Sequence, residues 1–148
     1  MRVVVQRSLK ARCLVEGKNV GEIDKGLMVL VGFTEGDNKE SIDYMVKKIV
    51  NLRIFDDENG VMNKSLLDVG GSILSISQFT LYGDAKKGNR PSYIEAMKGD
   101  EAVHLYELFN EKLREYDIVF KEGIFVEDMI VSLKNHGPFT IVLTEKDI

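Results

Sequence analysis

The 148-residue sequence contains a single cysteine, so no disulfide can form within the chain. Chains without disulfides are typical of reducing compartments, and we expect a cytoplasmic protein. Cys13 stands in the alternating segment KARCLVE, a pattern that favours a small buried side chain over a reactive thiol. Long apolar runs are lacking as well. No stretch approaches the length of a membrane span, and the apolar run in MRVVVQRSLK is too short for a secretion signal, so we expect no membrane association.

A broad basic surface is also missing, because the formal net charge is −4 and the sequence pI is about 5.3. This balance argues against a protein that coats DNA or other nucleic acid non-specifically, since such binding needs a basic face. One local patch could still hold a nucleic-acid end. Hydrophobic residues make up 44% of the chain, which is enough for one ordinary core, and we expect a single domain over residues 1–148.

Common catalytic signatures are absent from the sequence. There is no glycine-rich phosphate loop with lysine, no HExxH, no CxxC and no GxSxG. The acidic segment RIFDDENGVMN lacks the spacing of a calcium loop, and we predict no metal and no cofactor. Of the two histidines, His104 falls in a predicted helix and fits a surface position. His136 directly precedes a Gly-Pro pair and could belong to a site.

The predicted elements follow the order strands, helix, strands, helix, strands. Apolar faces at helical spacing predict helices over residues 41–52 and 99–116. The segment around Asn59-Gly60 predicts a hairpin. Longer strand-like segments cover residues 3–7, 10–16, 26–33, 72–84, 118–121, 129–134 and 139–143. Because strands cluster instead of alternating with helices, the sequence predicts an α+β fold with a mainly antiparallel or barrel-like sheet.

The predicted strand SISQFTLYGD contains polar residues at positions where a buried strand would carry apolar ones. Ser77, Gln78 and Thr80 stand within four positions. A half-exposed strand with its hydroxyls in water explains this pattern. A small polar site at a strand end, where hydroxyls and backbone N–H groups meet a substrate carbonyl, explains it as well.

The next loop, AKKGNRPSY, gathers Lys86, Lys87 and Arg90 in an acidic protein. Such a run is either a solvated charged face or a phosphate-binding rim beside the polar strand. Near the C-terminus, Gly137-Pro138 separates the strand-like segments MIVSL and FTIVL. This pair is either a turn between two strands or a cis bond that belongs to a site. The local pattern leaves both questions open.

Taken together, these segments resemble the D-aminoacyl-tRNA deacylase family. SQFTLYGD, KGNRPSY and GIFVEDMIVSLKNHGPFT carry the resemblance, and VVVQR, GLMVLVGF and RIFDDENGVMN fit in the same order. The likeness therefore spans nearly the whole chain. It implies a barrel-like sheet with the two long helices packed outside. It also implies a cytoplasmic homodimer that hydrolyses the ester joining a D-amino acid, or glycine, to the terminal adenosine of tRNA.

The resemblance also assigns roles to residues. Gly137 and Pro138 would form a cis dipeptide that enters the partner subunit's pocket and leaves no room for an L side chain. Ser77, Gln78 and Thr80 would line the other wall, with backbone N–H groups at Phe79 and Thr80 as oxyanion donors. Thr80 is either a nucleophile or a pocket residue beside an attacking water, assisted by the ribose 2′-OH.

Phe125 and Met129 match positions near the family's terminal-adenosine pocket, although an ordinary core pair also fits them. Lys86, Lys87 and Arg90 would meet acceptor-stem phosphates. The chain departs from the commoner family pattern at His136 and Phe139 around Gly-Pro and at two larger residues after Phe125. The two larger residues after Phe125 are Val126 and Glu127. Fine substrate preference is the property that such changes affect.

Two other functions compete with this hypothesis. The same scaffold could hydrolyse small acyl esters, or it could bind the acceptor end of tRNA without catalysis. The intact pair of motifs, SQFT and NxGPxT, favours the enzyme.

Overall fold

The computed structural model describes residues 1–144. Its elements are β1 (Arg2–Val15), β2 (Lys18–Ile23), β3 (Gly26–Gly32), α1 (Lys39–Asn51), β4 (Phe55–Asp56), β5 (Met62–Lys64), α2 (Leu66–Val69), β6 (Ser72–Ser77), the 3-10 turn η1 (Phe79–Tyr82), α3 (Gly99–Arg114), β7 (Val119–Glu122) and β8 (Ile130–Thr144). No described helix is both long enough and apolar enough to cross a membrane. The two long predicted helices are α1 and α3, and both lie outside the sheet.

The main sheet has the strand order β2-β1-β3-β6-β7, with β8 paired to β1. Strand β1 is antiparallel to β2, β3 and β8, whereas β3–β6 and β6–β7 are parallel. Each parallel pair is joined through a helix, α1 for the first and α3 for the second, as parallel connections require. The predicted α+β barrel-like fold is confirmed, but the sheet is mixed because of these two crossovers.

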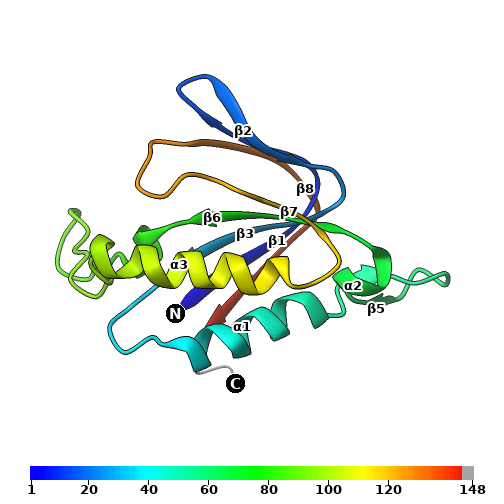
Figure 1. Ribbon diagram of the computed structural model, residues 1–148, viewed down its shortest axis with the longest axis horizontal. Coiled ribbons are helices and arrows are strands. Elements are labelled where there is room, and N and C mark those ends of the chain that lie inside the picture. Colours follow the sequence, from blue (N-terminus) through cyan, green and yellow to red (C-terminus); the bar gives the residue numbers. More distant parts are fainter. Residues whose placement is uncertain (145–148) are drawn as a thin grey trace.

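The sheet is strongly curved, and α1 and α3 lie side by side along one of its faces (Figure 1). Strand β2 curls over until it approaches β7. A Cβ on Gly21 would lie 3.2 Å from the carbonyl oxygen of Glu122 and 3.3 Å from Cβ of Lys121. A Cβ at this position would be tightly packed, which shows how near the two ends of the sheet come, and the barrel is almost closed there.

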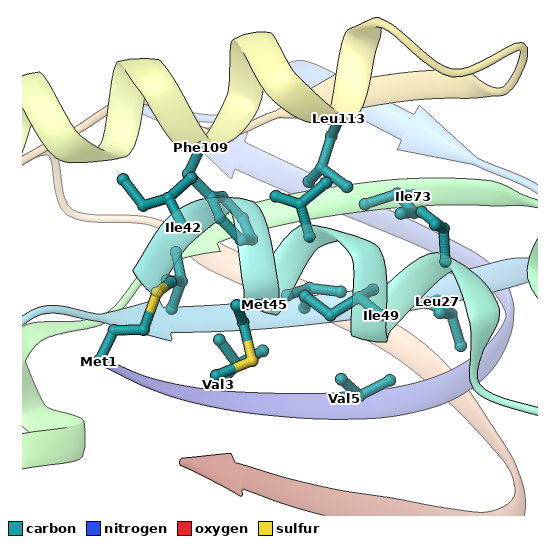
Figure 2. Close-up of a cluster of buried hydrophobic side chains, with 14 of the residues drawn as sticks. Met1, Val3, Val5, Leu27, Ile42, Met45, Ile49, Ile73, Phe109 and Leu113 are labelled. Atoms are coloured by element: carbon teal, nitrogen blue, oxygen red, sulfur yellow. The ribbon is translucent and has the colours of Figure 1, made fainter. Parts of the chain in front are cut away.

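Strand β3 is buried on both faces, as its continuous apolar sequence predicted. Leu27, Val29 and Val31 face the helices, and Met28 faces the barrel interior. Figure 2 shows the larger cluster, where Phe109 and Leu113 of α3 meet side chains of α1 and the sheet. The smaller cluster fills the barrel and includes Cys13, which is fully buried; burial raises the pKa of its thiol. The prediction of a small core cysteine is confirmed.

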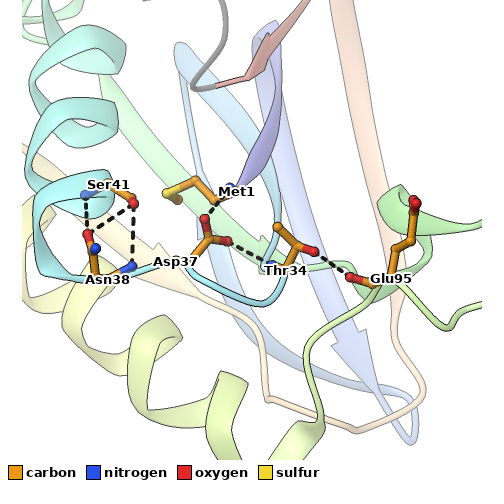
Figure 3. Close-up of polar contacts among 6 residues, drawn as sticks. All are labelled: Met1, Thr34, Asp37, Asn38, Ser41 and Glu95. Atoms are coloured by element: carbon orange, nitrogen blue, oxygen red, sulfur yellow. Dashed lines mark hydrogen bonds and ion pairs between the residues drawn. The ribbon is translucent and has the colours of Figure 1, made fainter.

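The turn before α1 is held by side-chain hydrogen bonds (Figure 3). Asn38 caps the helix by accepting from the backbone N–H of Ser41. Asp37 accepts from the amino group of Met1 at 2.5 Å and from the backbone N–H of Thr34 at 2.7 Å. Thr34 donates its hydroxyl to the carbonyl of Glu95. These bonds connect the end of β3 to the segment before α3.

Three predicted strand boundaries were wrong. Residues 3–7 and 10–16 form one strand, β1, and residues 129–134 and 139–143 form one strand, β8. Strands β1 and β8 are paired with each other on both sides of an irregular stretch, in which the register of the pairing shifts twice between Gln6 and Ala11. The predicted strand over residues 72–84 ends at Ser77, and a 3-10 turn follows. The alternation of faces expected beyond Ser77 therefore does not occur.

The start of the β3–β6 pair allows no side chain at Gly26. A Cβ there would lie 1.9 Å from the carbonyl oxygen of Ser72, a backbone atom that cannot swing away. We expect Gly26→Ala to lower the free energy of unfolding by about 2–3 kcal/mol or more, because overpacking forces the two strands apart. Urea unfolding followed by circular dichroism measures the change.

Gly99→Ala is the matched control, since its Cβ would lie 4.0 Å from the ring of Phe125, an ordinary contact. In the first turn of α3, alanine should be neutral or stabilising by up to about 1 kcal/mol. Equal unfolding midpoints for the two variants would contradict the close approach at Gly26.

Candidate active site

A cavity of about 690 Å³ opens beside the C-terminal ends of β3 and β6. Three segments distant in the sequence surround it, namely the end of β6 with η1, the segment before α3, and the segment between β7 and β8. Its lining includes Phe33, Ser77, Gln78, Phe79, Tyr93, Met97, Lys98, Ala102, Phe125, Glu127, Asp128 and Met129. The cavity therefore brings residues of the predicted SQFT wall together with Phe125 and Met129, which were predicted to lie near an adenosine pocket.

The first wall begins where β6 ends. The backbone N–H of Gln78 still bonds the carbonyl of Val31 at 2.7 Å, and the chain then turns into η1. A Cβ on Gly32 would lie 2.8 Å from the carbonyl oxygen of Gln78, so a glycine in β3 lets this turn pack closely. The turn directs Ser77, Gln78 and Phe79 to the cavity.

The backbone N–H groups at the start of η1 have no acceptor. Within residues 1–144 neither Phe79 nor Thr80 donates its N–H to another atom. The first N–H groups of a helical turn have no partner inside the turn, so they are free for a ligand. The amide of Gln78 donates to the hydroxyl of Thr80, which is exposed and adjoins the cavity without being part of its lining.

The second wall is the segment between β7 and β8. Phe125 and Met129 line the cavity and also pack against the two hydrophobic clusters, as the core interpretation predicted, and their binding of the terminal adenosine stays a prediction. The ring of Phe125 lies 5.7 Å from that of Tyr106 on α3. Met129 passes close to Gly123, whose Cβ would lie 2.6 Å from the sulfur.

The third wall is the segment before α3, which the sequence analysis did not predict as part of the site. Tyr93 meets the ring of Phe79 edge to face, with 5.1 Å between centroids. The backbone N–H of Met97 bonds the carbonyl of Phe33 at 3.0 Å. Tyr93 stood in the motif KGNRPSY, which could have indicated it. Met97 had no local signal, because only the crossover places it beside β3.

The predicted cations lie on a loop next to the cavity and outside its lining. Asp84 and Ser92 close this loop by two backbone hydrogen bonds of 2.7 and 2.8 Å. Lys86, Lys87 and Arg90 are all exposed on it. These two hydrogen bonds hold the loop next to Tyr93, and the three positively charged side chains on it are accessible from solvent.

Gly137 and Pro138 lie in a bulge of β8, and the peptide bond between them is cis. Asn135 pairs with Ser8 and Thr140 pairs with Gln6, so the four residues 136–139 stand opposite Arg7 alone. The motif NxGPxT closes this bulge. The side chain of Asn135 accepts from the backbone N–H of Phe139 at 2.8 Å and donates to the hydroxyl of Thr140 at 3.1 Å.

Arg7 supports the bulge from β1. Its Nε donates to the carbonyl of His136 at 3.0 Å, and its Nη1 donates to the carbonyl of Ile54 at 2.8 Å. The guanidinium also lies 5.0 Å from the centre of the Phe139 ring. Phe139 is thus a packing residue for Arg7. His136 contributes a backbone carbonyl, and within residues 1–144 its imidazole makes no hydrogen bond.

The bulge is far from the cavity of the same chain. Ser77 pairs with Val31, and Val31 pairs with Val3 of β1. Arg7 and the bulge lie four residues further along β1, about 13 Å away at roughly 3.3 Å per residue, and the path from β6 to β8 crosses three strand spacings of about 4.8 Å. Gly137 and Pro138 accordingly do not line the cavity.

The described residues contain no group of three His, Cys, Asp or Glu side chains placed to hold a metal. Comparison with known proteins identifies the family of this chain. A family model described as D-Tyr-tRNA(Tyr) deacylase matches residues 4–144. The D-aminoacyl-tRNA deacylases of Anoxybacillus flavithermus and Thermosipho africanus are each 53% identical to this chain. They align over 99% and 100% of it and over 100% and 99% of their own lengths.

This chain belongs to the D-aminoacyl-tRNA deacylase family. A solved structure titled "c-Myc DNA Unwinding Element Binding Protein" has the same fold with a TM-score of 0.93, 39% identity, and coverage of 98% of this chain and 99% of its own. A probable eukaryotic D-amino acid tRNA deacylase superposes with a TM-score of 0.81 at 20% identity, covering 96% and 97%, which supports the fold alone. The resemblance stated from the sequence is confirmed.

Within this family fold, the predicted site residues fall into three places. The residues from Ser77 to Thr80 lie in or beside the cavity with Phe125 and Met129. The cations Lys86, Lys87 and Arg90 lie on the neighbouring loop, and Gly137-Pro138 lies on β8 across the sheet. One chain therefore brings the SQFT segment, Phe125 and Met129 together, and its Gly137-Pro138 pair lies outside this cavity.

Proposed function

We propose that this chain hydrolyses the ester that joins a D-amino acid, or glycine, to the 3′-terminal adenosine of tRNA. As a D-aminoacyl-tRNA deacylase it is a hydrolase of aminoacyl-tRNA esters. The observation that carries the finer proposal is the polarity of the cavity. Within residues 1–144 the backbone N–H groups of Phe79, which lines one wall, and of the adjoining Thr80 have no acceptor, and apolar Phe125 and Met129 line another wall. Translation takes place in the cytoplasm, which is the compartment we propose.

The polar wall suits the ester. Water attacks the ester carbonyl carbon, the carbonyl oxygen becomes an oxyanion, and the two free N–H groups can donate to it. The bond to the ribose 3′ oxygen then breaks, that oxygen takes a proton, and the free amino acid and tRNA leave. The ribose 2′-OH is the group placed next to the reacting ester, and we propose that it assists the attacking water.

Thr80 fits a pocket residue better than a nucleophile. Its hydroxyl accepts a hydrogen bond from the amide of Gln78, an amide that cannot take up a proton. A threonine nucleophile needs a base within hydrogen-bond reach, and within residues 1–144 no His, Asp, Glu or Lys side chain hydrogen-bonds to Thr80. Gln78 and Thr80 together then fix the turn whose N–H groups face the substrate.

The apolar wall suits the terminal adenosine. Phe125 presents an aromatic ring to the cavity, and aromatic rings stack on unpaired bases. Lys86, Lys87 and Arg90 extend the same surface with positive charge, where phosphates of the acceptor stem would pass. The overall negative charge elsewhere keeps this binding local.

Chirality selection is proposed to come from a second copy of the chain. Gly137-Pro138 lies too far across the sheet to reach its own cavity, yet it is exposed at β8. Within residues 1–144, β8 pairs only with β1, and Ile130 and Val142 on it are 65% and 54% exposed. A homodimer would cover these apolar side chains and place the Gly-Pro pair of one subunit in the cavity of the other, where it would exclude an L side chain.

The deciding assay compares D-Tyr-tRNA, L-Tyr-tRNA and Gly-tRNA. We expect rapid loss of the D-ester and the glycyl ester, and loss of the L-ester only at the rate seen without protein. Equal hydrolysis of D- and L-esters would indicate a general ester hydrolase. Tight binding with no hydrolysis would indicate a non-catalytic binder of the tRNA end and would refute the proposal.

Thr80→Val tests the nucleophile directly, because it removes the hydroxyl and keeps the shape. If Thr80 only supports the turn, kcat should fall by no more than about tenfold, whereas loss of a covalent nucleophile costs on the order of 10⁴-fold or more. Single-turnover hydrolysis of D-Tyr-tRNA measures it, with Thr80→Ser as the hydroxyl-retaining control. A loss on the larger scale in Thr80→Val alone would overturn the water mechanism.

Complementation tests the cross-subunit site. A Cβ at Gly137 would lie 3.1 Å from Nη2 of Arg7 and from the backbone N of Phe139, so Gly137→Ala displaces the bulge. Gln78→Ala impairs the other wall. We expect both homodimers to be inactive and heterodimers of the two variants to regain about half of the wild-type activity, since one of two composite sites is intact.

Purified heterodimers carrying two different affinity tags make this measurement free of exchange between subunits. Heterodimers as inactive as the homodimers, or a fully active Gly137→Ala homodimer, would show that Gly137 does not act in the partner's site.

A further inference from the structure

A stripe of polar residues on α3 extends from the interior behind the cavity to the surface at Arg114. Tyr106, Asn110 and Arg114 are spaced by four, which places them on one side of the helix. The first two are 3% and 1% exposed, and the side chain that faces them from β6, Ser75, is fully buried. Buried polar groups are costly unless they are paired, so their partners indicate what this stripe holds in place.

Asn110 and Arg114 of the stripe connect α3 to β6 and β7. The hydroxyl of Ser75 donates to the side-chain oxygen of Asn110 at 2.7 Å. The amide of Asn110 donates to one carboxylate oxygen of Glu122, and Arg114 donates to the other. Helix α3 is therefore connected to both strands just before they leave the sheet.

Tyr106, the first residue of the stripe, hydrogen-bonds to the backbone carbonyl of Ser75. The oxygen of Ser75 accepts the hydroxyl of Tyr106 at 2.9 Å and the backbone N–H of Gly123 at 2.9 Å. Ser75 lies two residues before Ser77 of the first wall, and Gly123 lies two residues before Phe125 of the second. This carbonyl is thus the point where both walls and α3 are joined.

The ring of Tyr106 carries the connection to the cavity. It lies 5.7 Å from the ring of Phe125 with an angle of 35° between the planes. Since the hydroxyl bond to Ser75 fixes where the Tyr106 ring lies, it also fixes the surface against which Phe125 packs. Burial raises the pKa of Tyr106, so its hydroxyl stays protonated and remains a donor.

We propose that Tyr106 is a positioning residue for substrate binding, which acts by holding Phe125 and the segment between β7 and β8 at the cavity. This inference rests on the proposed function, in which Phe125 contacts the terminal adenosine. A network that only stabilised the fold would change the free energy of unfolding and leave KM as it was.

Tyr106→Phe removes one oxygen and keeps the ring. We expect KM for D-Tyr-tRNA to rise by about tenfold, the scale of one lost hydrogen bond, with kcat changed by less than about twofold. Tyr116→Phe is the matched control, because it removes the same atom from a partly buried tyrosine just beyond α3 that makes no side-chain hydrogen bond within residues 1–144. Its KM should equal that of the wild type.

A double-mutant cycle with Phe125→Leu tests whether Tyr106 acts through Phe125. If it does, adding Tyr106→Phe to Phe125→Leu should raise KM by less than about twofold, because the positioned ring is already gone. Fully additive effects would overturn the inference, as would a KM for Tyr106→Phe equal to that of Tyr116→Phe.

Hydrogen–deuterium exchange gives a readout that does not depend on activity. In Tyr106→Phe we expect faster exchange in residues 123–129 than in Tyr116→Phe, and unchanged exchange there would overturn the inference. Failure of the wild-type chain to hydrolyse D-Tyr-tRNA would refute the proposed function instead, and the exchange measurement would still report whether Tyr106 holds the segment.

Discussion

The parallel pairing of β3 with β6 is the constraint on which the rest of the molecule depends. At its start, Gly26 lies against the backbone of Ser72 with no room for a side chain, and at its end Val31 pairs with Ser77. Helix α1 lies in the crossover that joins these two parallel strands. It packs against one face of the sheet that they form. The cavity opens where the pair ends, because the backbone of Gln78 makes one last bond to Val31 and then turns.

Much of this frame could be predicted from the sequence, since it depends on burial. The run GLMVLVGF predicted a strand buried on both faces, and the spacing of apolar residues predicted both long helices. The end of β6 could not be predicted in this way. Gln78 and Thr80 continue an alternating pattern, and the turn there packs closely only because residue 32 is a glycine beside the backbone of Gln78. Such a contact joins residues 46 positions apart and leaves no local trace.

The predicted site shows the same division. SQFT and NxGPxT were recognised by their resemblance to the family, and each contains a short-range contact, the Gln78–Thr80 hydrogen bond in one and the Asn135–Thr140 hydrogen bond in the other. Strand β8 was predicted as two strands because the Gly137-Pro138 bulge looks like a turn unless the pairing of β1 on both sides of it is known. Asn110 was missed for a different reason. A polar residue on a helix predicts exposure, and only its bonds to Ser75 and Glu122 explain its burial.

The proposed mechanism uses no acid or base side chain of the protein, although Lys98, Glu127 and Asp128 line the cavity. The oxyanion donors are backbone N–H groups, and the assisting hydroxyl belongs to the substrate's own ribose. Neither contacts the amino-acid side chain, so the chemistry itself would be indifferent to which D-amino acid is attached. Selection would then depend on the space that the partner's Gly137-Pro138 leaves, which distinguishes handedness and not side-chain type. Under this arrangement glycine enters with the D-amino acids, because it has no side chain to exclude.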